Sequence, residues 1–210
     1  MPPEEIAADG HPERGGFLPP IPLPSRMWAG GELRFHAPLA VGDTVRRVST
    51  IAAVDLKSGR SGQLVFVTVR HETFVGDRLA ITDIQNLVYK DLTASPPLPA
   101  GSAPSSAALV ADPVLLFRYS ALTFNGHRIH YDRDYAVTRE GYPGLVVHGP
   151  LQATLLMNHA ARLKGSPPAI FRYRGVSPLI EGQPFHLKAA QDEVWLEDGA
   201  GRKTMAATYS

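Results

Sequence analysis

Apolar and polar positions form several short blocks in the first half of the chain. These blocks are rich in β-branched and aromatic side chains and lie at residues 32–56, 63–75 and 78–89. Turn-forming residues separate them at 57–62 and at 76–77. Such a pattern predicts an antiparallel meander of strands. Residues 64–70 are almost wholly apolar, which predicts that their strand is covered on both faces.

The second half carries a clear helical pattern at residues 150–164. Pro150 suits the first position of a helix, and Gly165, followed by two prolines at 167–168, ends it. Leucines and alanines recur between them with a period of roughly 3.6 residues, which is typical of a helix with one apolar face. We therefore expect this helix to lie on a sheet. The expected strands of that sheet are residues 169–176, 183–190, 193–197 and 202–209.

A weak internal repeat relates the two halves. The sequence PLAVG at 38–42 recurs as PLIEG at 178–182, and each copy leads into a strand-turn-strand pattern. Residues 9–25, which occupy the place of the helix in the first copy, contain five prolines and three glycines and read as an ordered loop. The pattern predicts an N-terminal unit at 1–92 and a C-terminal unit at 108–210. A Pro- and Ser-rich linker at 93–107 joins them.

Composition excludes several classes of protein. Lys and Arg number 21 and Asp and Glu 20, so the net charge of +1 gives no general attraction to nucleic acid or anionic membranes. The chain has no cysteine, which excludes disulfides, a thiolate nucleophile and a cysteine-based zinc site. We find neither an apolar run of the ~18 residues that span a membrane nor a signal-peptide pattern. We expect no membrane or nucleic-acid partner and a cytoplasmic location, or the mitochondrial matrix in a eukaryote.

Candidate chemistry concentrates in residues 118–132. Asn125 and Gly126 form a strong turn signal, and His127, Arg128 and His130 follow without helical spacing or strand alternation. We expect these side chains to project from a loop or one short turn. A solvated loop with two histidines is an alternative. A metal site is a weaker one, because no further ligands stand at a recognisable spacing.

A second feature is the apolar run 144–148, which turns directly into the predicted helix. Gly149 at the helix start lets a ligand approach the backbone, and free N–H groups there favour an oxygen that gains negative charge. His130 or His127 can exchange protons near the reference pKa of ~6.5, whereas Asn125 can only orient by hydrogen bonds. If the loop faces the helix start, the predicted chemistry passes through an enolate beside a carbonyl.

These residues resemble a known family. The segments 117–132 and 141–151, with FLPPIPLPSRMWAGG at 17–31, are similar to MaoC-like hydratases and dehydratases of the hotdog fold. The resemblance is to the branch of mesaconyl-C4-CoA hydratases and mitochondrial 3-hydroxyacyl-thioester dehydratases. It implies an α+β double hotdog, in which two antiparallel sheets each wrap a helix and the acyl thioester lies at their junction. It also implies that the first hotdog lacks its N-terminal strand and helix in this chain. Without that helix, one apolar face of the first-half sheet would be left open. The second half, the Pro-rich segment or another subunit would then cover it.

The resemblance implies a hydro-lyase that adds or removes water across the α,β double bond of an enoyl or 3-hydroxyacyl thioester. Asn125 and His130 would hold the water, and the Gly149 amide would polarise the thioester carbonyl. The wider family has Asp at the position of Asn125. Substrate contacts are expected from Arg118, Tyr119, His127, Arg128 and His148. Arg172 is a further candidate for a basic rim that binds phosphates.

The implied substrate is a CoA thioester, with no metal and no redox cofactor, and the implied assembly is a homodimer or a higher homo-oligomer. A hotdog thioesterase, which would direct the water at the carbonyl, is one alternative. A non-catalytic acyl-thioester-binding subunit is another. A free carboxylate on the acyl group would require a cation deep in the pocket, and no arginine is identifiable as that group from the sequence.

Overall fold

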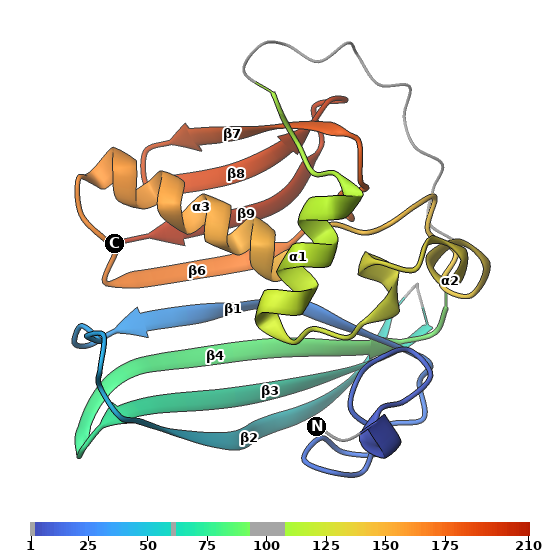
Figure 1. The fold of residues 1–210 in the computed structure, drawn as a ribbon, viewed down its shortest axis with the longest axis horizontal. Coiled ribbons are helices and arrows are strands. Elements are labelled where there is room, and N and C mark those ends of the chain that lie inside the picture. The colour runs from blue at the N-terminus through green and yellow to red at the C-terminus, as the bar shows by residue number, and fades with distance from the viewer. Residues whose placement is uncertain (1–2, 60–61, 93–107) are drawn as a thin grey trace.

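The computed structural model describes residues 3–59, 62–92 and 108–210 (Figure 1). The elements in chain order are η1 (Pro3–Glu5), β1 (Ser25–Phe35), β2 (Val45–Gly59), β3 (Gly62–Val75), β4 (Arg78–Lys90), β5 (Leu109–Val110), α1 (Pro113–Thr123), η2 (Arg128–His130), α2 (Arg133–Thr138), α3 (Gly149–Lys164), β6 (Ile170–Gly175), β7 (Pro184–Ala190), β8 (Glu193–Asp198) and β9 (Lys203–Tyr209). The strands form one antiparallel sheet in the order β2-β3-β4-β1-β6-β9-β8-β7-β5.

The two expected sheets are joined through β1 and β6, which pair from Gly30 opposite Arg174 to Arg34 opposite Ile170. The strand order is mirrored about this pair, so β1 to β4 correspond to β6 to β9. The repeated segments 38–42 and 178–182 precede β2 and β7, which hold equivalent places. This is the double-hotdog arrangement that the resemblance implies.

The predicted helix of the second half is confirmed as α3, which lies against the sheet of β6 to β9 (Figure 1). It ends at Gly165, which adopts a φ of 78°. The helix residues Leu151, Leu156 and Ala160 are buried in one apolar core with Phe171 and Leu196 of the sheet. This packing fixes the first turn of α3 relative to the strands.

The Pro-rich segment covers part of the first half of the sheet. Ile21 is buried with Val67, Val69 and Tyr89, and Leu18 and Leu23 pack against them. The Arg14 guanidinium secures the segment by donating to the carbonyls of Ile21, Leu23 and Pro24 at 2.8, 2.5 and 2.6 Å. Among residues 3–59 and 62–92 the helical content is η1 alone.

One expectation was wrong. The block 32–56 is not continuous, because a loop at 36–44 separates β1 from β2 and β1 begins already at Ser25. β1 pairs with β4 and β6 rather than with β2. Residues 118–123, where no helix is predicted, form the end of helix α1, whereas His127, Arg128 and His130 lie on a loop and one short turn, η2, as expected.

Two further expectations concern the linker between the halves and the absence of a membrane-spanning segment. The predicted linker 93–107 lies outside the described residues, so it and the unit boundaries stay predictions. Within the described ranges, none of the helices combines the length and apolar character needed to cross a bilayer.

Candidate active site

A cavity of about 970 Å³ lies where the two halves of the sheet meet the start of α3. Its walls combine residues of β1 and β4 with residues of the loop after α1 and of the first turn of α3. Asn125, His130 and Gly149 all line it. The structure thus places the loop and the helix start, which are expected to face each other, on one cavity.

Local hydrogen bonds shape the loop that carries Asn125. Helix α1 begins at its cap Asp112, whose side chain accepts from the Leu115 N–H at 2.7 Å. The helix ends at Phe124, which has a left-handed φ of 52°, and the Asn125 N–H donates to the Ser120 carbonyl at 2.9 Å. The Asn125 side-chain oxygen then accepts from the His127 N–H at 3.1 Å. The amide side chain therefore turns the chain and also lines the cavity.

The environment of His130 selects one tautomer. Its Nδ1 lies 2.7 Å from the Val146 carbonyl oxygen. Since a carbonyl only accepts, Nδ1 carries the proton, and Nε2 of the neutral ring keeps a lone pair. Burial lowers the pKa of His130 to about 4, partly offset by the bond to Val146. The imidazole is therefore neutral at pH 7 and can accept a proton at Nε2.

The His148 ring packs against the His130 ring. The two rings stack with centroids 3.7 Å apart, and His148 Nε2 lies 2.8 Å from the Ser120 hydroxyl. His148 is fully buried and does not line the cavity, so its placement does not support the predicted substrate contact. Burial, with the neighbouring His130, lowers its pKa to about 3.

Gly149 begins α3 with its backbone close to Trp28. A β-carbon at Gly149 would lie 2.8 Å from Cε3 of the indole, so only glycine allows this packing. Within the described part of the chain, the Gly149 N–H has no hydrogen-bond acceptor. Gln152 steadies the turn by donating to the Val147 carbonyl at 3.2 Å and accepting from Thr204 at 2.9 Å. A free amide at the positive end of a helix stabilises an oxygen that gains charge.

Comparison with known proteins identifies the family. The family model for hydroxyacyl-thioester dehydratase type 2 matches residues 1–181. The chain belongs to this family.

Two curated relatives extend the match along most of the chain. A mesaconyl-C(4)-CoA hydratase of Chloroflexus aurantiacus is 49% identical over 194 residues, which cover 90% of this chain and 69% of the relative. A mitochondrial hydroxyacyl-thioester dehydratase type 2 of Schizosaccharomyces pombe is 28% identical over 207 residues, covering 85% and 69%. These matches agree with the branch that the sequence motifs indicate.

Solved structures support the fold. HtdX of Mycobacterium tuberculosis matches with a TM-score of 0.65 at 20% identity, covering 91% of this chain and 79% of that chain. A MaoC-like dehydratase matches with a TM-score of 0.67 at 17% identity, covering 90% and 76%. A further M. tuberculosis protein, described as having a double hotdog fold, gives a TM-score of 0.56 at 18% identity over 89% and 74%. The chain therefore has the double-hotdog fold of MaoC-like proteins.

The other predicted substrate-contacting residues divide into two groups. Tyr119 and His127 line the cavity of this family member. The three arginines do not line it. Arg118 is exposed on α1, Arg128 pairs with Asp132, and Arg172 is exposed on β6 and paired with Glu32.

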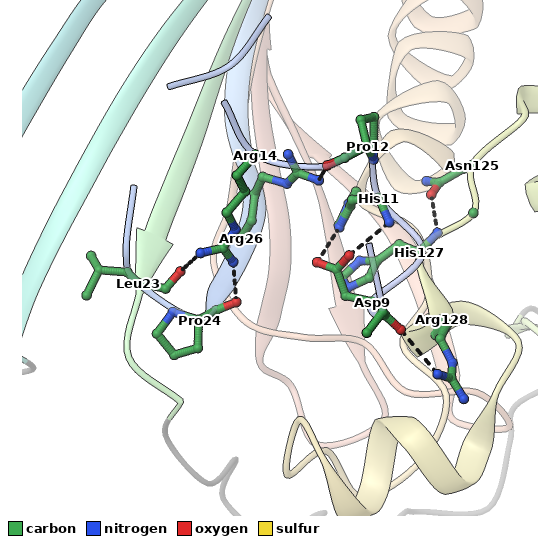
Figure 2. Close-up of polar contacts among 12 residues, drawn as sticks. Asp9, His11, Pro12, Arg14, Leu23, Pro24, Arg26, Asn125, His127 and Arg128 are labelled. Atoms are coloured by element: carbon green, nitrogen blue, oxygen red, sulfur yellow. Dashed lines mark hydrogen bonds and ion pairs between the residues drawn. The ribbon is translucent and has the colours of Figure 1, made fainter. Parts of the chain in front are cut away.

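The structure adds residues that the sequence motifs did not indicate (Figure 2). His11 Nδ1 lies 3.0 Å from Asp9 Oδ2, and the His11 ring packs on the His127 ring with centroids 4.0 Å apart. His11, His127 and Arg26 all line the cavity. No local signal distinguishes Asp9 and His11, because they meet His127 from more than 100 positions away in the chain.

Hydrogen bonds hold this N-terminal loop against the loop that carries Asn125 and His127. The Arg128 N–H donates to the Asp9 carbonyl at 2.9 Å, and the Arg128 side chain donates to the Ala8 carbonyl at 3.1 Å. Gly10, with a φ of 85°, lies against the Gly126 carbonyl so closely that no side chain fits between them. The wall beside His130 is therefore built from two segments more than 100 positions apart in the chain.

Asp9, His11 and His127 form an electrostatically coupled group. Burial alone would raise the pKa of Asp9, but hydrogen bonds from the side chain and backbone of His11 hold it well below its ordinary value. Burial lowers the pKa of His127 to about 2, and the nearby His11 adds to this effect. The possible ligand atoms of the three residues lie within 4.8 Å of one another, a set that a divalent cation could use. The Asp9–His11 hydrogen bond and the ring packing account for the arrangement without an ion, and the expected absence of a metal stays a prediction.

Proposed function

We propose that this member of the hydroxyacyl-thioester dehydratase type 2 family is a hydro-lyase acting on the α,β double bond of an enoyl or 3-hydroxyacyl thioester. The observation that carries the proposal is one shared cavity. His130, fixed in the tautomer that leaves Nε2 unprotonated, and the Gly149 amide at the start of α3 both line it. A base and an oxyanion donor on one cavity are what reversible hydration beside a carbonyl requires.

In the hydration direction, His130 Nε2 takes a proton from water as the water oxygen bonds to Cβ. The electron pair of the double bond moves through Cα to the thioester oxygen, which becomes an enolate. The Gly149 N–H and the end of α3 stabilise this negative charge. The imidazolium then returns its proton to Cα, so that water has been added and His130 is restored. Dehydration follows the same steps in reverse.

Asn125 acts on the water without titrating. Its oxygen is held by the His127 N–H, so the amide plane has a fixed orientation at the cavity wall. The amide N–H₂ group is suited to donate to the water or hydroxyl oxygen. This role differs from that of a carboxylate, which would accept.

The carrier and the cellular setting form part of the same proposal. CoA is the proposed carrier, and a thioester of the mesaconyl-C4 type is the finer proposal, supported by the name of the C. aurantiacus relative. We propose no cofactor, a location in the cytoplasm or a mitochondrial matrix, and a homo-oligomer. Exposed apolar side chains on α1, among them Val114, Phe117 and Leu122, support an intersubunit contact there.

The test is incubation with crotonyl-CoA, with loss of enoyl absorbance measured against release of free thiol. We expect hydration without thiol release, and a fall of about 10²–10⁴-fold in kcat/KM for His130→Ala. His159→Ala, on α3 but outside the histidine stack, is the matched control. Free thiol without hydration would favour a thioesterase. No turnover of any acyl-CoA by the native chain would favour a non-catalytic binding subunit.

A further inference from the structure

Arg26 is a buried cation on the cavity wall that the proposed reaction does not use. It lies near the start of β1, is 6% exposed, and lines the cavity together with His11 and His127. Its Nη2 donates to the Pro12 carbonyl at 3.3 Å, a long hydrogen bond to a neutral acceptor. Across residues 3–59, 62–92 and 108–210, no carboxylate forms an ion pair with it.

A buried guanidinium that has no ion pair is stabilised when an anion binds to it. Removing a charge from water is costly unless a counter-charge compensates it, and one carbonyl supplies little compensation. Arginine presents a planar fork of N–H donors that matches a carboxylate through two parallel hydrogen bonds. Because Arg26 faces the cavity, the missing anion is one that enters with the ligand.

We propose that Arg26 is the residue that binds the free carboxylate of a thioester of the mesaconyl-C4 type, which is a monothioester of a short unsaturated dicarboxylic acid. This inference rests on the proposed function and assigns a residue to the substrate class proposed there. Arg26 is then a specificity-determining residue, whereas His130 and Gly149 carry out the chemistry.

The position of Arg26 favours an acyl carboxylate over a phosphate of CoA. The guanidinium is almost fully enclosed and shares its wall with the histidines around His130, where the proposed reaction places the acyl group. Lys90, which stands opposite Ser25 in the sheet register, lines the same cavity and adds positive charge near Arg26.

The cavity also contains the carboxyl group of Asp83, which would repel a second carboxylate at close range. Asp83 stands opposite Leu33, seven positions further along β1 than Arg26. At a rise of about 3.3 Å per residue, this places the two groups roughly 20 Å apart along the strand. Burial raises the pKa of Asp83, which further weakens the repulsion. A carboxylate is therefore attracted to the Arg26 end of the cavity.

The test compares binding of succinyl-CoA and butyryl-CoA, which share a four-carbon chain and differ in whether it ends in a carboxylate. Calorimetry on the native chain should give tighter binding of succinyl-CoA. Arg26→Met should weaken succinyl-CoA binding by about 10–100-fold and change butyryl-CoA binding less than about threefold. Arg26→Lys should retain part of the preference. Arg162→Met, at an exposed arginine in the last turn of α3 and outside the cavity, is the matched control.

Each outcome decides the proposal. Equal affinity of the native chain for both ligands would overturn it, and so would equal weakening of both by Arg26→Met, which would assign Arg26 to CoA or to the fold. If Arg26→Met does not fold, a preserved preference in Arg26→Lys and its loss in Arg26→Gln would support the proposal. Crotonyl-CoA turnover tests the proposed function separately, because that substrate has no second carboxylate.

Discussion

The imidazole rings of His130 and His148 stack with their centroids 3.7 Å apart. One ring lines the cavity and the other is fully buried behind it. His130 is anchored by the Val146 carbonyl and His148 by the Ser120 hydroxyl, so neither ring rotates freely. Protonating either ring would place a charge against its neighbour in a dry environment. The stack therefore requires both rings to be neutral.

The histidine stack makes stability depend on pH. Burial lowers the pKa of His130 from 6.5 to about 4, so between these values the unfolded chain binds a proton that the folded chain excludes. The free energy of unfolding must then fall as the pH drops from 6.5 to about 4, by roughly 3 kcal/mol at about 1.4 kcal/mol per unit. Above pH 6.5 both states are neutral and this contribution is constant. Urea unfolding at a series of pH values measures it.

The variant that isolates this effect is His130→Gln, whose amide can still donate to the Val146 carbonyl. Its stability should decline less steeply than that of the native chain between pH 6.5 and 4. His159→Gln controls for the loss of an imidazole elsewhere on the protein. An unchanged acid slope in His130→Gln would show that the stack does not exclude protons.

Gly149 is expected to tolerate no side chain. In Gly149→Ala the new methyl group would lie 2.8 Å from the Trp28 ring, which stacks on Tyr173 with centroids 4.6 Å apart and has little room to move. The displaced indole or helix start would misplace the oxyanion donor, and we expect kcat/KM to fall about 10²–10³-fold. Steady-state hydration of crotonyl-CoA measures the loss.

Gly16→Ala is the matched control, because Gly16 lies outside the cavity and its methyl group would be 4.0 Å from the Glu13 carbonyl oxygen, an ordinary contact. The double variant Gly149→Ala with Trp28→Leu removes the clash and should recover part of the activity. Full activity in Gly149→Ala alone would contradict the role given to this backbone.

Gly10 is expected to hold the N-terminal loop against the loop that carries Asn125 and His127. A methyl group at Gly10 would overlap the Gly126 carbonyl oxygen, so Gly10→Ala should separate the two loops and remove His11 from His127. We expect faster hydrogen exchange at the Arg128 amide, which donates to the Asp9 carbonyl. Activity should fall roughly 10-fold or more, since small displacements near the reacting atoms are costly.

Gly15→Ala separates steric overlap from backbone strain. Both glycines have positive φ, 85° and 89°, but a methyl group at Gly15 would meet its nearest neighbour at 3.7 Å. Each alanine costs about 1–2 kcal/mol of backbone strain. Equal effects of the two variants on exchange at Arg128 would show that the Gly10–Gly126 contact is unimportant.

Features that depend on local sequence could be predicted. Pro150 and Gly165 mark the ends of α3, and Gly76 and Asp77 mark a hairpin, because these residues act on the backbone beside them. Helix α1 was missed since its apolar residues lie all round it. Val114, Phe117 and Leu122 are exposed, so no single face is marked by the pattern.

Features that depend on long-range contact could not be predicted from the residues alone. The glycines at 30 and 31 weaken the strand signal of β1, yet a β-carbon at Gly30 would lie 2.5 Å from the Tyr173 carbonyl oxygen of β6. The need for glycine comes from a strand more than 140 positions away. Arg26 is a second example, because its lack of an ion pair becomes visible only in the folded structure, where distant segments form the cavity.

Removal of divalent cations is expected to leave hydration unchanged. Asp9, His11 and His127 could supply three ligands, but the proton between Asp9 and His11 Nδ1 would have to be lost before that nitrogen could bind a metal. Asp9 and His11 already hydrogen-bond to each other without a metal ion. The proposed steps use His130 and the Gly149 amide. Activity after dialysis against EDTA, with and without added Zn²⁺, measures the effect. A loss that Zn²⁺ restores in the native chain but not in His11→Ala would instead establish a metal centre at these three residues.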